Sequence, residues 1–188
     1  MLFSLLLAGG KSSRMGEDKS RLVFEGQTLL ECTYSLLESL DANHVLVSGK
    51  VDGYQCIEDL VPQAGPPGGL YSAVEYINEQ YGLKDSLLLV VPVDMPLLNA
   101  EILKHLIEQA KGKEACQFED EVFPCIFRLT SELKQHLAEI FAESAEKGDK
   151  RSMKALLQKF NAHKVSKEGF ADKFFMNVNT PEDWEKII

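Results

Sequence analysis

The chain has 188 residues, of which 45% are hydrophobic and 26% are charged, a composition typical of one soluble folded domain rather than a disordered chain. Its 29 acidic and 20 basic residues give a formal net charge of −9. Nucleic acids and anionic membranes are bound through basic surfaces, so this balance argues against both as partners. It does not argue against a small anion in a locally basic pocket.

Neither a membrane span nor a zinc site is expected. The longest apolar runs, 5–8 and 87–93, are far shorter than the ~20 residues of a membrane helix, and no basic stretch of a signal peptide precedes the first. The four cysteines form no CxxC pair and lie in apolar segments, and the four histidines are scattered. We therefore expect a reduced, cytoplasmic protein without a His/Cys zinc site.

In the first half of the chain, strands and helices alternate. An apolar run at 3–8 predicts a buried strand that ends at Gly9-Gly10, and a polar loop follows. Thr28 and Glu31 have the spacing of a capping box, and apolar residues at helical intervals predict a helix from there to about residue 40. The next elements expected are strands at 44–48 and 55–58, a helix at 70–81, a strand at 86–93 and a helix capped by Asn99.

The order of these elements predicts the fold class. The segment 86–93 is nearly all Leu and Val, as in a central parallel strand covered on both faces. Alternating strands and helices indicate βαβ units with right-handed crossovers, and hence a doubly wound, mostly parallel α/β sheet. The second half predicts a small hairpin and helical part: strands at 115–118 and 122–128, helices at 131–141 and 152–160, strands at 163–166 and 175–178, and a helix from Thr180-Pro181.

Positive charge is concentrated in the loop after the first strand. Two acidic residues oppose four of the chain's 20 basic residues there: Glu17 and Asp18 against Lys11, Arg14, Lys19 and Arg21. Ligands of open α/β sheets bind beyond the carboxyl ends of the strands, where glycines let backbone N–H groups approach anionic oxygens. The loop therefore predicts a polyphosphate site, although the P-loop and GxGxxG motifs are absent. A glycine turn with solvated charges is the alternative.

Residues 7–19 read LAGGKSSRMGEDK. This pattern, LAGGxSxRMGxDK, resembles the nucleotidyltransferases of molybdenum cofactor biosynthesis, most closely their guanylyltransferase branch, and later segments also match, so the resemblance covers most of the chain. It implies transfer of GMP from GTP to the phosphate of molybdopterin, with Mg²⁺ as cofactor and pyrophosphate as product. It also implies a nucleotide-binding half at 1–112, a pterin-binding half at 113–188, and molybdoenzymes or their chaperones as recipients of the product.

The resemblance assigns most of the nucleotide contacts to the charged loop. The backbone that enters the loop would contact the guanine nucleotide through Leu7, Ala8, Gly9 and Gly10. Lys19 would bind the phosphates, which suits a mobile ammonium, and Arg14 would clamp a phosphate with its planar guanidinium. For either side chain alone, the alternative is a solvated surface cation.

Further nucleotide contacts are implied at Ser48, Asp59 and Gly69. Relatives often have an asparagine at the position of Ser48, and a serine offers fewer hydrogen bonds to a base. Asp59 follows an expected strand, so a simple turn residue is the alternative for it. Gly69 belongs to the sequence GPPGG, which resembles the family's GPxxG and would line the same pocket.

Metal and pterin contacts are implied at two other places. Asp94 follows the most apolar strand, and the resemblance assigns it to Mg²⁺; helix capping is the alternative, although Asn99 suits that role better. Asn177 and Asn179, in NVNTPED, would project to one side of a strand and contact the pterin, unless they serve a turn. At Phe123-Pro124, relatives often carry His-Pro.

The implied reaction needs little acid–base chemistry. A phosphate monoester, with a second pKa of about 6, is already anionic at neutral pH. We therefore expect catalysis by positioning and charge neutralisation, with Lys19, Arg14 and Asp94 as the catalytic residues. The alternatives are a cytidylyl- or sugar-phosphate nucleotidyltransferase, and a nucleotide-binding regulator without catalysis.

Overall fold

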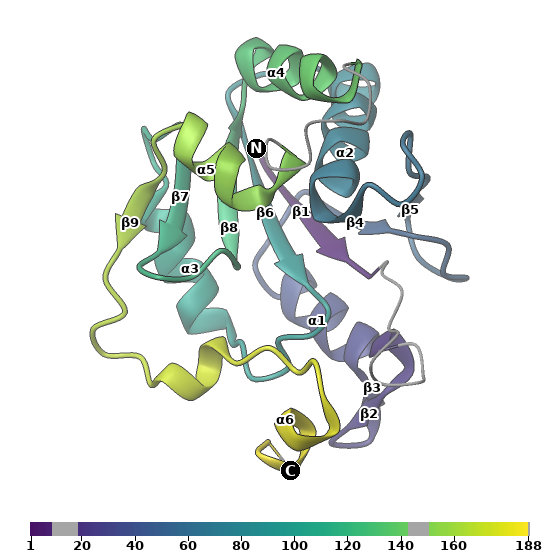
Figure 1. The fold of residues 1–188 in the computed structure, drawn as a ribbon, viewed down its shortest axis with the longest axis vertical. Helices are drawn as coiled ribbons and strands as arrows, with labels where there is room; N and C mark the ends of the chain where they lie inside the picture. The colour runs from purple at the N-terminus through teal and green to yellow at the C-terminus, as the bar shows by residue number, and fades with distance from the viewer. Residues whose placement is uncertain (9–18, 143–150, 188) are drawn as a thin grey trace.

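The computed structural model describes residues 1–8, 19–142 and 151–187, and within these ranges seven strands form one sheet (Figure 1). Their order across the sheet is β5-β4-β1-β6-β8-β7-β9. The strands are β1 (Leu2–Leu7), β4 (His44–Ser48), β5 (Cys56–Ile57), β6 (Ser86–Pro92), β7 (Ala115–Phe118), β8 (Cys125–Leu129) and β9 (His163–Val165). All neighbours are parallel except β8, which is antiparallel to both β6 and β7. The predicted mostly parallel α/β sheet is confirmed.

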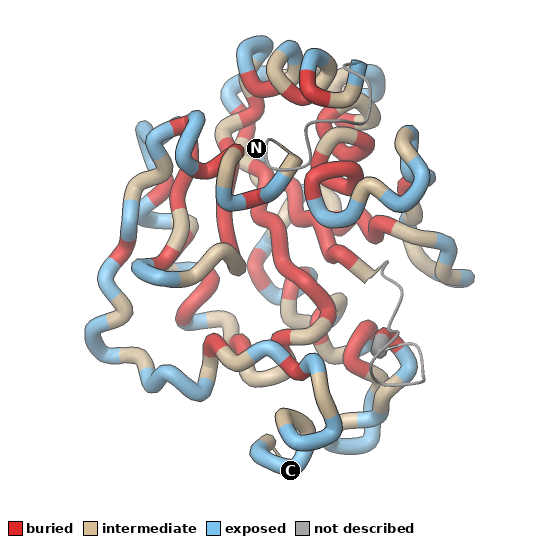
Figure 2. The backbone as a smooth tube through the Cα atoms, in the orientation of Figure 1, coloured by how far each residue is buried: buried red, intermediate tan, exposed pale blue. Residues whose placement is uncertain are grey.

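Helices cover both faces of the sheet, as in a doubly wound fold. One face packs against α2 (Gly65–Tyr81), α4 (Ser131–Ala142) and α5 (Met153–Lys159), and the other against α1 (Leu29–Glu38) and α3 (Ala100–Gln109). Figure 2 shows the buried residues concentrated along the strands and on the inner sides of these helices. Among the described helices, none has the length and apolar character needed to cross a membrane.

The central strands are apolar throughout because both of their faces are covered. Along β6, Leu88 and Val90 belong to the core beneath α2, whereas Leu89 and Val91 belong to the core beneath α3. All four side chains are fully buried. The continuous apolar run that predicted a strand covered on both faces therefore has the expected structural cause.

Helix boundaries follow local sequence signals. Thr28 and Glu31 form the predicted capping box of α1. α2 begins at Gly65, earlier than expected, because two prolines fit the first turn, where a backbone N–H has no partner within the helix. The last helix, α6 (Pro181–Glu185), has its own capping box, formed by Thr180 and Asp183. The Asp183 carboxylate accepts hydrogen bonds from the Asn179 N–H and from Thr180, and these bonds hold its pKa below the ordinary value.

Two parts of the chain differ from the prediction. The loop expected before α1 contains a short hairpin, β2 (Val23–Phe24) and β3 (Gln27–Thr28), whose turn places Glu25 and Gly26 at positive φ. The strand expected at 175–178 was wrong: a 3-10 helix, η3 (Asp172–Phe175), ends there and an extended segment follows it. That segment forms no ladder, because it crosses the carboxyl end of β6 instead of running beside a strand.

Other strand boundaries are shorter than expected. β5 has two residues instead of four, and β8 begins at Cys125 rather than at 122. Pro124 precedes β8 and has no N–H to donate to a ladder, which accounts for the later start. The bond between Phe123 and Pro124 is cis.

Candidate active site

The ends of three parallel strands form the site. Leu7 of β1 pairs in register with Ser48 of β4 on one side and with Pro92 of β6 on the other. Because strand ends at one level share an edge of the sheet, the residues after them lie together. The segment after β6 extends this edge, since the Val93 N–H donates to the Leu7 carbonyl at 3.1 Å.

The charged loop leaves from this edge. Residues 9–18 lie outside the described ranges, and with them Gly9, Gly10 and Arg14, so their expected roles stay predictions. The chain is described again from η1 (Lys19–Arg21), although only the backbone of Lys19 is described. Ala8, the last described residue before the loop, is half-buried at the end of β1.

Four residues predicted to contact the nucleotide come together at the end of β4. The Ser48 hydroxyl is buried, 6% exposed, and donates to Oδ1 of Asp59 at 3.3 Å. A Cβ at Gly69 would lie 2.9 Å from the Ser48 Oγ and 3.0 Å from Cδ2 of Leu7, so only a glycine lets α2 approach the strand ends this closely. The Asp59 residue is exposed, so its carboxylate borders both the Ser48 hydroxyl and solvent.

The beginning of α2 is held firmly against the segment that carries Asp59. The buried Ser72 hydroxyl accepts from the Leu60 N–H at 2.9 Å and donates to the Gly68 carbonyl at 2.9 Å. A Cβ at Gly68 would lie 2.5 Å from that of Ala64, so the second glycine of the turn is also required by close packing. α2 has 17 residues and no acidic residue in its first turn, so no carboxylate of that turn neutralises the positive end of the helix dipole.

Asp94 and the NVN segment meet at the end of β6. The Asp94 carbonyl accepts from the Val178 N–H at 2.8 Å, which joins two segments that are far apart in the chain (Figure 1). Val178 is fully buried, while Asn177 and Asn179 on either side of it are exposed. The structure thus brings both asparagines next to Asp94, although not on a strand.

The capping alternative for Asp94 is wrong, because Asn99 holds that role. The Asn99 Oδ1 accepts from the Ile102 N–H at 3.1 Å and begins α3. Asp94 itself is half-buried directly after β6. At the other segment, the turn before α6 is closed by Thr180 and Asp183, and Asn179 contributes its backbone N–H to that turn.

The donor set at Asp94 fits a metal shared with a substrate. Across the described ranges, no group of three or more His, Cys, Asp or Glu side chains could hold a metal by itself. Mg²⁺ is commonly held by one or two carboxylates together with substrate phosphates, because it keeps a hard oxygen shell and needs no protein cage. A half-buried carboxylate at the end of a central strand fits that arrangement.

The two buried cysteines, Cys116 and Cys125, are poor candidates for a nucleophile. All four are free thiols. Burial raises the pKa of Cys116 to about 11 and also raises that of Cys125, which is fully buried. A thiol with so high a pKa stays protonated at neutral pH and is a poor nucleophile.

Known proteins match nearly the whole chain. Residues 4–164 match a family model described as a MobA-like NTP transferase domain. The molybdenum cofactor guanylyltransferase of Xanthomonas euvesicatoria is 39% identical over 185 residues, which cover 98% of this chain and 93% of that protein. That of Yersinia pestis is 28% identical over 195 residues, 97% of this chain and 94% of the relative.

Solved structures share the fold. Molybdopterin-guanine dinucleotide biosynthesis protein A of Archaeoglobus fulgidus superposes with a TM-score of 0.74 at 20% identity, covering 98% of this chain and 96% of its own. The 2-C-methyl-D-erythritol 4-phosphate cytidylyltransferase of Thermus thermophilus has a TM-score of 0.64 at 20% identity, covering 100% and 97%. These two likenesses concern the architecture of the sheet and its helices.

Proposed function

This chain belongs to the MobA-like NTP transferase family, and on that premise we propose that it transfers GMP from GTP to the phosphate of molybdopterin. The products are the guanine dinucleotide cofactor and pyrophosphate. The observation that carries the proposal is the 39% identity, over 98% of the chain, with a molybdenum cofactor guanylyltransferase. Enzymes of this kind generally use a divalent metal, and we propose Mg²⁺ here.

The nucleotide would lie across the ends of β1 and β4. Guanine presents two adjacent donors, its ring N–H and its amino group, and a carboxylate with two acceptor oxygens is their complement. Asp59 is exposed beside the buried Ser48 hydroxyl, at the place where Gly69 leaves room against the strand ends. The phosphates would extend toward the charged loop, where Leu7, Ala8, Gly9 and Gly10 offer backbone groups.

The reaction joins two anions and needs charge neutralisation more than proton transfer. An oxygen of the molybdopterin phosphate attacks the α-phosphorus of GTP, a P–O bond forms, and the bond to the β-phosphate oxygen breaks to release pyrophosphate. The attacking phosphate is largely deprotonated at neutral pH. Lys19 and Arg14 would hold the phosphates in line and offset the charge that develops on the leaving group.

Asp94 would hold the metal together with the substrate phosphates, and the metal when bound supplies further neutralisation of phosphate charge. Val178 anchors the NVN segment to the carbonyl of the same residue. Asn177 and Asn179 would therefore meet the acceptor next to the metal carboxylate. This arrangement supports a division into a nucleotide half at 1–112 and an acceptor half at 113–188.

We also propose where the protein works and which proteins it meets. Its free cysteines suit the reducing cytoplasm. The finished cofactor would pass to molybdoenzymes or to their chaperones.

Ser48→Ala tests the nucleotide pocket. The change removes the hydroxyl that donates to Asp59, and loss of one bond to a charged group, about 1.5 kcal/mol, corresponds to a rise of about tenfold in KM for GTP. We expect kcat to change little, because the hydroxyl lies at the base end of the nucleotide. Steady-state kinetics measures both values. Ser86→Ala is the control, since Ser86 is equally buried at the opposite end of the sheet; equal effects of both changes would contradict the assignment.

The function is tested with one enzyme and three nucleotides. The protein is incubated with molybdopterin, Mg²⁺ and GTP, CTP or ATP in separate reactions, and pyrophosphate is measured. Release with GTP alone is expected. Release with CTP alone would assign the chain to cytidylyl transfer, which the shared fold permits. Binding of GTP without release would identify a regulator.

A further inference from the structure

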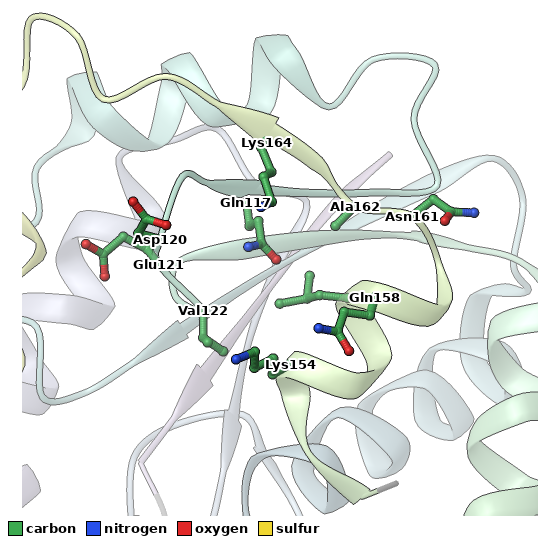
Figure 3. Close-up of a pocket in the computed structure, with 10 residues that line it drawn as sticks. Gln117, Asp120, Glu121, Val122, Lys154, Gln158, Asn161, Ala162 and Lys164 are labelled. Atoms are coloured by element: carbon green, nitrogen blue, oxygen red, sulfur yellow. The ribbon is translucent and has the colours of Figure 1, made fainter. Parts of the chain in front are cut away.

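A cavity of about 400 Å³ lies between β7, α5 and β9, in the second half of the chain (Figure 3). Its two cations, Lys154 and Lys164, are exposed, and of the residues that line it only Leu157 is buried. Exposed lysines carry their charge in water, so by themselves they select no particular ligand. A buried polar network lies instead toward the other edge of the sheet, where the start of α2 meets the segment after β5 (Figure 1).

This network is centred on the hydroxyl of Ser72 in α2, which is almost completely buried. The Ser72 oxygen accepts from the Leu60 N–H at 2.9 Å, and its proton is donated to the Gly68 carbonyl, also at 2.9 Å. A backbone N–H can only donate and a carbonyl can only accept, so the two partners fix the direction of the hydroxyl. Ser72 therefore joins its own helix to the neighbouring segment through two directed bonds.

The bond to Leu60 holds the segment that carries Asp59. Residues 58–64, which lie inside the described range 19–142, form neither a helix nor a strand, so regular backbone bonds do not fix their path. The Leu60 side chain is 57% exposed, so its burial also does little to hold the segment. Because the Leu60 N–H directly follows Asp59, its bond to Ser72 limits how far the Asp59 backbone can move.

One face of α2 positions both partners of the Ser48–Asp59 pair. Gly69 lies against Ser48, since a Cβ there would be 2.9 Å from the Ser48 Oγ, and Ser72 follows three residues later on the same face of the helix. The Ser48 hydroxyl lies 3.3 Å from Oδ1 of Asp59, which is longer than most bonds between two oxygens. The position of the Asp59 carboxylate therefore depends on its backbone as well as on Ser48.

We propose that Ser72 is a positioning residue for the selection of guanine. The proposal rests on the proposed function, in which Asp59 presents two acceptor oxygens to the ring N–H and the amino group of the base. Ser72 does not touch the nucleotide; through the Leu60 N–H it holds the Asp59 backbone where both oxygens face the base. Without the Ser72 hydroxyl, the Leu60 N–H turns to water and the Asp59 carboxylate moves away from the base.

Ser72→Ala is expected to lower the preference for GTP over inosine triphosphate, which lacks only the amino group of guanine. In the wild type, KM for inosine triphosphate should exceed KM for GTP by about tenfold or more, the effect of one hydrogen bond to a charged group. In Ser72→Ala this ratio should fall below about threefold, because GTP loses two bonds to Asp59 and inosine triphosphate loses one. kcat should stay within about twofold, since the phosphates react at the other end of the nucleotide.

Thr33→Val is the matched control. The buried Thr33 hydroxyl donates to the Leu29 carbonyl at 2.8 Å, one turn earlier in α1, as the Ser72 hydroxyl does in α2. Among the described residues, no N–H of another segment donates to it. The control loses a hydroxyl bond within a helix and should keep the wild-type ratio. Melting curves establish that both variants are folded; if Ser72→Ala is not, Ser72→Cys takes its place, because a sulfur accepts only weakly and should also lower the ratio.

A double-mutant cycle with Asp59→Asn shows whether Ser72 acts through Asp59. If it does, Ser72→Ala lowers the ratio in the wild-type background and changes it little in the Asp59→Asn background. Equal effects in the two backgrounds, or a wild-type ratio in a folded Ser72→Ala protein, would overturn the proposal. A lower kcat with an unchanged ratio would identify a merely structural role, which overturns it as well.

Calorimetric titration with GTP and with inosine triphosphate, each in the presence of Mg²⁺, gives the ratio of the two Kd values without turnover. The wild type should bind GTP more tightly, and Ser72→Ala should bind the two nucleotides nearly equally. Equal binding of both by the wild type would overturn the proposal, because Asp59 would then not contact the amino group. A protein that shows the expected ratios but releases no pyrophosphate contradicts the proposed function and leaves the role of Ser72 standing.

Discussion

Asp94→Ala is expected to lower the rate of pyrophosphate release by about a thousandfold, which corresponds to roughly 4 kcal/mol of lost transition-state stabilisation. The carboxylate is half-buried directly after the central strand β6, where it would hold the metal against the substrate phosphates. The fold should survive, because the bond from Val178 goes to the backbone carbonyl of Asp94, and an alanine keeps that carbonyl. Initial rates and the melting temperature measure the two effects separately.

Two further variants make the Asp94 result specific. Asp94→Asn keeps the size of the side chain but weakens a metal ligand, so higher Mg²⁺ concentrations should restore part of its activity. Asp52→Ala removes an exposed carboxylate from the turn between β4 and β5 and should leave the rate near that of the wild type. A folded Asp94→Ala protein with a near-normal rate would refute the assignment of this residue to the metal.

Lys19→Ala is expected to reduce kcat by about a hundredfold or more, because a phosphate in the transition state would lose its charged partner. Lys19 starts η1, the first described element after the charged loop. The charge should matter more than the shape of the side chain, so Lys19→Arg is expected to retain more activity than the alanine variant. Single-turnover kinetics separates this loss from weaker binding of GTP.

The matched control for Lys19 is Lys111→Ala. Lys111 is an exposed lysine just beyond α3 that pairs with Glu108, so its removal costs little. It should leave kcat unchanged. A Lys19→Ala enzyme that is as fast as this control would show that the lysine is a solvated surface charge, which is the alternative considered for it.

Much of the fold could be predicted from local patterns. The capping box of Thr28 and Glu31 sets the start of α1, and the apolar run at 86–93 marks the strand that both cores cover. The hairpin of β2 and β3 escaped prediction because each strand has only two residues, too few to display an alternating pattern. The one local signal was Gly26, which takes a positive φ in the turn.

The segment 176–179 could not be predicted for a different reason. Its alternation of exposed asparagines around a buried Val178 has the period of a strand. The alternation instead reflects a single crossing over the end of β6, where Val178 fills the core and bonds to Asp94. A pattern of burial records which side chains are covered, not which element covers them.

The sequence by itself determined the class of the fold and the family. The fold class follows from periodicity and capping, and the family from a dense motif at 7–19, all of which depend on residues close together in the chain. The residues of the candidate site remain predictions that the resemblance implies. Only the tertiary structure decided which residues from separate segments meet: Ser48 with Asp59 and Gly69, and Asp94 with Val178. Strand order, register and helix packing bring those residues together. These features arise because the whole chain buries one core, and no local segment of the sequence encodes that burial.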